Sequence, residues 1–363
     1  MTNVTDVEAT SDIIEQISDE DISFVIQGAV VAETKQFIET VRKNFPKSEI
    51  VLSTWSGTST KSFFDLCDKI IINEDPGAEN HCFHHNVILS NNVNRQMVST
   101  VNGIGASSRR FVAKLRTDFT LLGCGILDFW NRYPKRLAFD QVFKHRIIVP
   151  NIYSRLFSDR PNSLPTPFHP SDLFAFGLKE DVLRLFGSCP LQTKEELSAW
   201  SMKFPNRAPY EENQWRWAPE QALFYHAVKT IYPDIEWIDY TDLRKEIINR
   251  SYNLMMNNFI FVNSNQIGLY SRKHLSAIRE LNLHEWPGII SNRVFEDWYK
   301  SKLDSSLLYR KDARGSAIDR YEFHRDKIKW NIKRLGRAMS FIFEPFVCLK
   351  YALLAKISKE RRI

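Results

Sequence analysis

The sequence has 363 residues, of which 43% are hydrophobic, 25% charged and 13% aromatic, a composition that excludes a disordered chain. The formal net charge is +6, but residues 326–363 hold ten Lys/Arg and three Asp/Glu, so the rest of the chain carries about −1. Because the basic excess is confined to this tail, nucleic acid is not expected as a partner. Five cysteines lie far apart without disulfide or zinc spacing, which indicates a reducing compartment.

The first part of the chain predicts strands that alternate with a helix. Residues 1–20 are polar and acidic, lack the parts of a signal peptide, and are expected to be a flexible lead-in. Residues 33–45 predict a helix that ends at Pro46. Apolar runs predict buried strands at residues 22–26, 49–55 and 68–73. These short intervals favour an α/β fold with a Rossmann-type, mixed but mainly parallel sheet flanked by helices.

A short strand in the middle of the chain carries the predicted site. Residues 111–115 predict a buried strand, and the charged residues Lys114, Arg116 and Asp118 mark its end. In open α/β sheets this edge faces the crevice where ligands bind. Cations there suit phosphate oxygens, and a carboxylate suits a metal ion or a ribose hydroxyl. A salt bridge that only holds the strand end is the structural alternative.

The regions on both sides of this strand complete the prediction. Residues 91–103, which include Asn94 and Arg95, predict a helix with one apolar stripe. Further helices are expected over residues 178–186, from Pro219 onward and through most of 271–325. Later strands are expected at residues 146–149, 259–262 and 266–270, with the last two forming a hairpin.

The order of these motifs resembles the GT-A glycosyltransferases. In the inverting family typified by cellulose and chitin synthases, a helix carries an Ala-Arg-Asn motif and the next strand ends in Asp-x-Asp. Here Asn94-Arg95-Gln96 and Arg116-Thr117-Asp118 stand in those places. Residues 22–270 are also similar to the WavE family of bacterial lipopolysaccharide and capsule biosynthesis. The segments that carry this likeness are Ile26-Gln27-Gly28, Leu52-Ser53-Thr54-Trp55, Asp75-Pro76-Gly77, Asn94-Arg95-Gln96, Ser99-Thr100 and Lys114-Leu115-Arg116-Thr117-Asp118.

The resemblance implies a GT-A-like domain over residues 21–300 that moves a sugar, with inversion, from a nucleotide-sugar donor to a bacterial surface glycan. It implies donor contacts from Gln27, Gly28, Thr54, Trp55, Asp75, Asn94, Arg95, Lys114, Arg116 and Asp118. Among these, the cationic residues are expected at the phosphates, and Asp118 at a ribose or metal. Structural alternatives are turn caps at Gln27, Thr54 and Asp75, and an ion pair between Arg95 and Asp118.

Two carboxylates compete for the role of catalytic base. In the resembled superfamily a Glu-Asp pair opens the corresponding helix and supplies the base, and here Glu220-Gln221 stands in that place. Asp172 is the other candidate. The structural alternatives are a first-turn glutamate favoured by the helix dipole and an ordinary turn aspartate. Acceptor contacts are expected from His169, Trp215 and Trp217.

The expected metal site departs from the resembled pattern. Related enzymes bind Mg²⁺ or Mn²⁺ with Asp-x-Asp, whereas here Arg116 leaves Asp118 as the single metal-ligand candidate. An arginine can itself neutralise phosphate, so the sequence leaves metal dependence open. Two other function classes also stay open: a sugar nucleotidyltransferase, whose glycine-rich basic loop has no counterpart after residues 22–26, and a non-catalytic scaffold of polysaccharide assembly.

Residues 301–363 predict a helical extension whose last part, 326–363, is basic and amphipathic. Its apolar run is interrupted by Glu344, Pro345 and Lys350, which argues against a transmembrane helix. Basic flanks around bulky apolar residues suit a helix in the membrane interface. We therefore expect a cytoplasmic protein held peripherally on the inner membrane, near a lipid-linked glycan acceptor. A helix packed on the catalytic domain, or a dimer contact, is the alternative.

Overall fold

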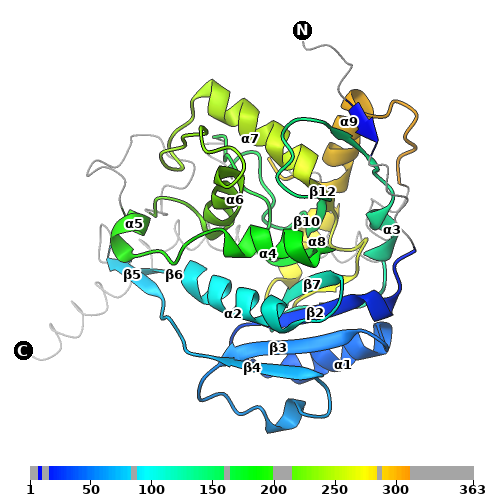
Figure 1. The fold of residues 1–363 in the computed structure, drawn as a ribbon, viewed down its shortest axis with the longest axis vertical. Coiled ribbons are helices and arrows are strands. Elements are labelled where there is room, and N and C mark those ends of the chain that lie inside the picture. Colours follow the sequence, from blue (N-terminus) through cyan, green and yellow to red (C-terminus); the bar gives the residue numbers. More distant parts are fainter. Residues whose placement is uncertain are drawn as a thin grey trace, which may run out of the picture. The chain divides into compact units, whose positions relative to one another are not determined.

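A seven-stranded sheet in the order β12-β10-β11-β7-β2-β3-β4 organises the computed structural model of the chain (Figure 1). Its strands are β2 (Ile22–Gln27), β3 (Glu49–Trp55), β4 (Lys69–Asn73), β7 (Phe111–Arg116), β10 (Ile147–Pro150), β11 (Phe174–Leu178) and β12 (Phe259–Val262). Neighbouring strands are parallel except at β11, which is antiparallel to both β7 and β10. The predicted α/β class with a mixed, mainly parallel sheet is thereby confirmed.

The structure describes residues 7–9, 16–82, 88–158, 164–198, 215–283 and 288–310. The chain divides into one unit, Met1–Ala313, and a second, Arg314–Ile363, which lies outside the described residues. The predicted amphipathic tail at residues 326–363 therefore falls outside the description. Within the described residues, no helix has both the length and the apolar character needed to cross a membrane.

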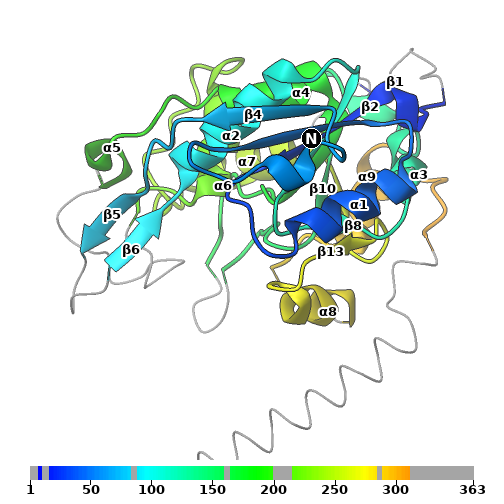
Figure 2. The same cartoon turned by 90° about the horizontal axis from the view of Figure 1, so that it is seen from below.

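Helices cover both faces of the sheet, which explains the almost continuous apolar sequence of the inner strands. Figure 2 shows α2 (Val93–Ala106) and α4 (Lys179–Gly187) on one face, and α1 (Thr34–Asn44) on the other. The helix α2 packs closely on β2, since a Cβ added at Gly103 would lie 2.5 Å from Cγ1 of Val25. This close contact positions the amino-terminal half of α2 against the carboxyl ends of β2 and β3.

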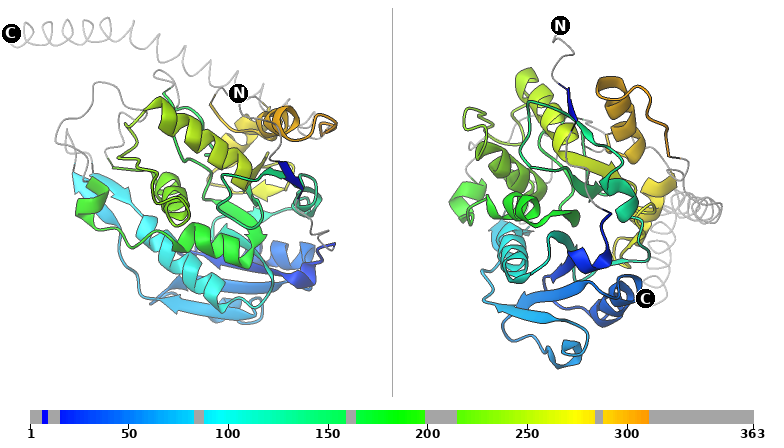
Figure 3. Two further views of the ribbon diagram at one scale, coloured as in Figure 1. Left: turned by 45° about the horizontal axis from the view of Figure 1, so that its top comes forward. Right: turned by 45° about the vertical axis from the view of Figure 1, so that its right-hand side comes forward.

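The remaining elements surround this core. Helices α7 (Lys245–Asn258) and α9 (Asn292–Lys302) lie beside β12 (Figure 3). Three small pairs form outside the central sheet: β1 (Val7–Ala9) with β9 (Lys135–Leu137), β5 (Glu79–Cys82) with β6 (Ile88–Asn91), and β8 (Thr120–Leu121) with β13 (Leu269–Tyr270). The other helices of the described residues are η1 (Asp19–Asp21), η2 (Lys61–Phe63), α3 (Leu127–Trp130), α5 (Lys194–Ser198), α6 (Pro219–Lys229) and α8 (Leu275–Leu283).

The predicted hairpin of residues 259–262 and 266–270 is wrong. The first segment, β12, pairs in parallel with β10 at one edge of the central sheet, and the second, β13 (Leu269–Tyr270), pairs with β8 (Thr120–Leu121). All four residues of β12 are buried, because α7 and α9 pack beside this edge strand, and an exposed hairpin would not bury them. Gly268, with φ +65°, turns the chain toward β8.

Candidate active site

A pocket of about 560 Å³ opens at the carboxyl ends of β2, β3 and β7. The predicted donor contacts that line it are Gln27, Gly28, Trp55, Asp75, Arg95, Arg116 and Asp118. Parallel strands end at the same edge of a sheet, and this is why segments that are nearly a hundred residues apart meet here. The sequence-based expectation of a crevice at this edge agrees with the described geometry.

The pocket wall is built from backbone and side chains that already bind one another. Gly28 adopts φ +111°, a conformation that glycine tolerates, and its N–H donates to the carbonyl of Ser53 at 2.9 Å. The N–H of Thr117 donates to the carbonyl of Gln27 at 3.0 Å. The Gln27 side chain accepts from Ser99 Oγ on α2 at 2.5 Å. The strand ends are therefore fixed before any ligand arrives, as a preorganised site requires.

Two arginine–aspartate pairs lie in this pocket. Arg116 donates through Nε and Nη2 to the two carboxylate oxygens of Asp118, at 2.9 and 2.7 Å. Arg95 on α2 holds Asp75 in the same bidentate way, at 2.8 and 2.7 Å. The ion pair between Arg95 and Asp118 that was considered as an alternative therefore does not form. Each arginine is oriented by a carboxylate, which fixes its planar donor group.

Three other predicted donor contacts do not line the pocket. Thr54 is buried, with its hydroxyl 3.4 Å from that of Thr58. The Asn94 amide bonds the backbone of Gln192 in both directions, at 2.7 and 2.8 Å, and so ties α2 to the segment before α5. Lys114 is completely buried. These three side chains make contacts within the protein and do not line the pocket.

Lys114 lies inside the core, although its charge predicted a position in the crevice. Its side chain faces the α4 layer, where Nζ sits 4.7 Å from the ring centre of Phe186. There it donates a hydrogen bond to the main-chain carbonyl of Asp172. Burial lowers the pKa of Lys114 to about 7, while the charge of Asp172 acts in the opposite direction. A buried polar partner at a fixed place explains how a lysine is tolerated in this strand.

The two candidate bases are brought together at the same edge. The strand β11 is antiparallel to its neighbours, so the first residue of β11 lies beside the carboxyl end of β7. Asp172 comes just before β11 begins. Glu220 is in the first turn of α6, which is joined to this region by Gln221 Nε2 donating to the carbonyl of Pro167 at 2.8 Å.

The carboxyl groups of Asp172 and Glu220 interact electrostatically. Burial, and then the charge of Asp172, raise the pKa of Glu220 well above its ordinary value, whereas the charges of Arg155 and Arg116 lower it. Neither carboxylate lines the pocket itself. Gln96 does, and its Nε2 donates to the carbonyl of Asp172 at 3.2 Å, so the pair lies next to the pocket wall.

The aromatic residues expected at the acceptor are packed into the protein. Trp215 and Trp217 are both buried, and Trp217 stacks on Trp237 with ring centres 5.9 Å apart. His169 is buried as well, with Nδ1 3.0 Å from the carbonyl of Tyr153. Burial lowers the pKa of His169 to about 3, which keeps its imidazole neutral at physiological pH. In the described geometry these rings fix the surroundings of Glu220 and offer no open stacking face.

Four residues near the site were missed by the sequence argument. Lys273 lines the pocket, and the His274 ring stacks on Phe119 at 5.2 Å. Tyr153, which has φ +62°, and Arg155 follow β10, and the charges of Arg155 and Glu220 both act on the Tyr153 hydroxyl. A non-glycine residue held in this conformation often belongs to a functional region. Because β10 also ends at this edge, Tyr153 and Arg155 could have been predicted there from the sequence in the same way as Asp118.

The residues present do not fit the divalent cation that Asp-x-Asp enzymes hold. Both carboxylate oxygens of Asp118 accept from Arg116. Throughout the part of the chain that the structure describes, no three His, Cys, Asp or Glu side chains are grouped so that they could bind a metal ion. Hard cations need several oxygen ligands that are not already neutralised.

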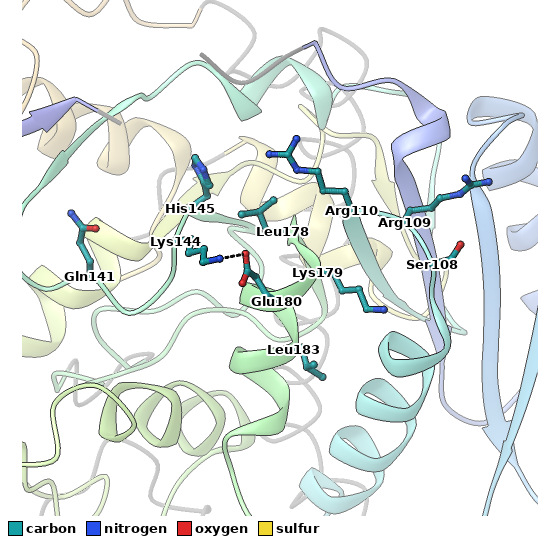
Figure 4. Close-up of a pocket in the computed structure, with 10 residues that line it drawn as sticks. All are labelled: Ser108, Arg109, Arg110, Gln141, Lys144, His145, Leu178, Lys179, Glu180 and Leu183. Atoms are coloured by element: carbon teal, nitrogen blue, oxygen red, sulfur yellow. Dashed lines mark ion pairs between the residues drawn. The ribbon is translucent and has the colours of Figure 1, made fainter. Parts of the chain in front are cut away.

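A second cavity of about 900 Å³ lies at the opposite edge of the sheet, where β7 begins and β11 ends (Figure 4). Among the described residues that line it, Glu180 is the acidic one, and it is paired with Lys144 at 2.7 Å. In Figure 4, Arg110 and Arg109 extend in opposite directions, so the cations do not converge on one point. The cavity holds none of the predicted site residues, and the pocket at Arg116 remains the candidate active site.

The structure is that of an α/β protein with a candidate ligand pocket, lined by charged residues of both signs, at the carboxyl edge of its sheet. Residues 22–314 match the family described as WavE lipopolysaccharide synthesis, which is most of the chain. The chain therefore belongs to this family, and the resemblance drawn from the sequence is confirmed. Family membership associates the protein with lipopolysaccharide synthesis. A comparison with curated proteins finds no match.

Proposed function

We propose that the protein is a glycosyltransferase of lipopolysaccharide or capsule synthesis, which moves a sugar from a nucleotide-sugar donor to a growing glycan. The observation that carries this proposal is the position of the pocket. Arginines and polar strand ends that suit a nucleotide phosphate lie next to a pair of interacting carboxylates that suit proton transfer. Family membership supports a biosynthetic role.

The proposed reaction inverts the anomeric carbon. An acceptor hydroxyl oxygen attacks this carbon while the bond to the donor phosphate breaks, and the bonding electrons leave with the phosphate. Arg116 and Lys273, which both line the pocket, would stabilise the charge that develops there. The hydroxyl proton passes to a carboxylate of the Asp172–Glu220 pair. A carboxyl whose pKa is raised toward neutrality is well suited to this transfer.

Glu220 is the preferred base within this pair. It lies in the first turn of α6 and is less completely buried than Asp172, whose carbonyl is held by Lys114 and Gln96. Asp172 then acts chiefly by holding the pKa of Glu220 up. The neighbouring Gln221 is a structural residue, because its Oε1 accepts from the N–H of Ala218 at 3.0 Å and so caps the helix.

The test is a panel of UDP-, GDP-, ADP-, dTDP- and CMP-sugars, offered with lipopolysaccharide core fractions and scored for release of nucleotide. We expect release with at least one donor, dependent on acceptor and strongly reduced in Glu220→Gln. Release of pyrophosphate from a nucleoside triphosphate and a sugar phosphate would instead support the nucleotidyltransferase class. If no donor is turned over and no nucleotide binds, the scaffold class is favoured.

For the carboxyl-terminal tail we propose attachment to the cytoplasmic face of the inner membrane. Its support is the sequence alone, ten Lys/Arg against three Asp/Glu over residues 326–363. Each cation near an anionic surface contributes on the order of 1 kcal/mol. The full chain should sediment with anionic liposomes at low salt, and a chain lacking residues 326–363 should not. Equal sedimentation of both, or of neither, would contradict the proposed anchor.

A further inference from the structure

The carboxylates in the candidate site are already neutralised by arginine. Asp118 is held by Arg116 and Asp75 by Arg95, each through two hydrogen bonds between 2.7 and 2.9 Å long. With Lys273, the described lining therefore carries three cations and two carboxylates, a net charge of about +1. A pocket with this balance attracts phosphate and repels a divalent cation.

The pairing also leaves part of Arg116 available. Asp118 engages Nε and Nη2, and among the described residues no hydrogen-bond acceptor engages Nη1. A guanidinium has five N–H donors in a rigid plane, so a carboxylate on one edge leaves the other edge aimed at a second anion. By contrast, Arg95 also donates through Nη1 to Asn92 at 3.0 Å, which leaves it less free. Arg116 is therefore the better phosphate ligand of the two.

We propose that the protein binds the phosphate groups of its donor without a divalent cation. In this inference, which rests on the proposed function, Arg116 supplies the positive charge that a metal ion supplies elsewhere. Asp118 is a positioning residue for Arg116 and not a metal ligand. At the position where Asp-x-Asp enzymes carry their first aspartate, this protein therefore carries an arginine that binds phosphate directly instead of a ligand for a metal ion.

The first test compares nucleotide binding with and without metal. Isothermal titration calorimetry of the full chain would use UDP, GDP, ADP, dTDP and CMP as probes, each in EDTA and in Mn²⁺. We expect the nucleotide that binds most tightly to have the same affinity in both buffers, within about twofold. Binding that needs Mn²⁺, or that tightens tenfold or more with it, would overturn this inference but leave the proposed function standing. If no probe binds in either buffer, the proposed function falls, and this inference with it.

The second test exchanges the charge at position 116. Arg116→Gln should weaken nucleotide binding in EDTA by about ten- to a hundredfold, the usual effect of losing a hydrogen bond to a charged group. Arg116→Asp, which recreates Asp-x-Asp, should bind still more weakly in EDTA and recover part of its affinity in Mn²⁺. Near-normal binding of Arg116→Gln in EDTA would overturn the inference, and this variant decides the question should Arg116→Asp fail to fold.

Two further variants complete the test, the first as a control for charge and the second as a test of the role of Asp118. Arg109→Asp makes the same charge change on an exposed residue at the opposite edge of the sheet, and it should bind nucleotide as the wild type does. Asp118→Asn tests the positioning role, because its effect should be equal in EDTA and in Mn²⁺. An effect of Asp118→Asn that is present in Mn²⁺ and absent in EDTA would show a metal ligand, and would overturn the inference.

Discussion

Replacing Lys114 by methionine should change how the free energy of unfolding depends on pH. The side chain is completely buried, and its pKa is lowered from 10.5 to about 7, first by burial. The unfolded chain therefore keeps this proton up to about pH 10.5, whereas the folded protein releases it near pH 7. Between these values the unfolded state binds more protons, so the wild type should become more stable as pH rises.

The size of the effect follows from the same two values. The whole difference between them corresponds to roughly 5 kcal/mol, present as a penalty below pH 7 and removed by pH 10.5. Linkage over the accessible range from pH 7 to pH 9 gives the wild type about 2 kcal/mol of added stability. Lys114→Met has no such proton to lose. Between pH 7 and pH 9 the free energy of unfolding of the wild type should therefore rise by about 2 kcal/mol relative to that of Lys114→Met.

The assay is urea unfolding of wild type and variant at pH 7, 8 and 9, followed by tryptophan fluorescence. The charges that face Lys114 are those of Asp172, Arg116, Asp118 and Glu220, and all four side chains are present in both proteins. Lys35→Met, on an exposed position of α1, is the matched control and should follow the wild type. Parallel pH profiles for wild type and Lys114→Met would refute the buried, partly neutral lysine.

The remaining predictions concern packing and catalysis. Gly103→Ala should lower the free energy of unfolding by about 1–3 kcal/mol through overpacking. Gly105→Ala on the same helix should raise it by up to about 1 kcal/mol, because an added Cβ meets nothing within 4 Å there. Thermal melts in which Gly103→Ala is the more stable of the two would contradict the packing of α2. Glu220→Gln should reduce turnover by about a hundredfold or more at unchanged donor affinity. Because burial and Asp172 raise the pKa of Glu220, the wild-type rate should also increase with pH through the neutral range, and a flat profile would argue against Glu220. Asp118→Ala should abolish transfer with circular dichroism and melting temperature preserved, and full activity would refute the site.

The sequence was most informative where a strand ended in polar or charged residues. Trp55, Arg116 and Asp118 were predicted to meet because parallel strands share one carboxyl edge, and all three line the pocket. The same reasoning failed for Lys114, because side chains alternate along a strand and the pattern does not reveal a buried carbonyl that can receive an ammonium group.

Other errors have equally specific causes. The sequence could not show that Trp217 stacks inside the protein, since an aromatic residue suits both a core and a sugar-binding face. Residues 259–262 pair with a strand more than a hundred positions earlier, and local sequence favoured the nearer partner. The pairing of Arg116 with Asp118 depends on both side-chain conformations, which the strand pattern leaves undetermined.

The most direct test of the proposed site is a crystal structure of the protein with the nucleotide that calorimetry identifies. The structure predicts phosphate oxygens within hydrogen-bonding distance of Arg116, with the rest of the nucleotide between Gln27 and Trp55 at the carboxyl edge of the sheet. A nucleotide found instead in the cavity beside Arg110 and Lys179, at the opposite edge, would contradict the assignment of the active site.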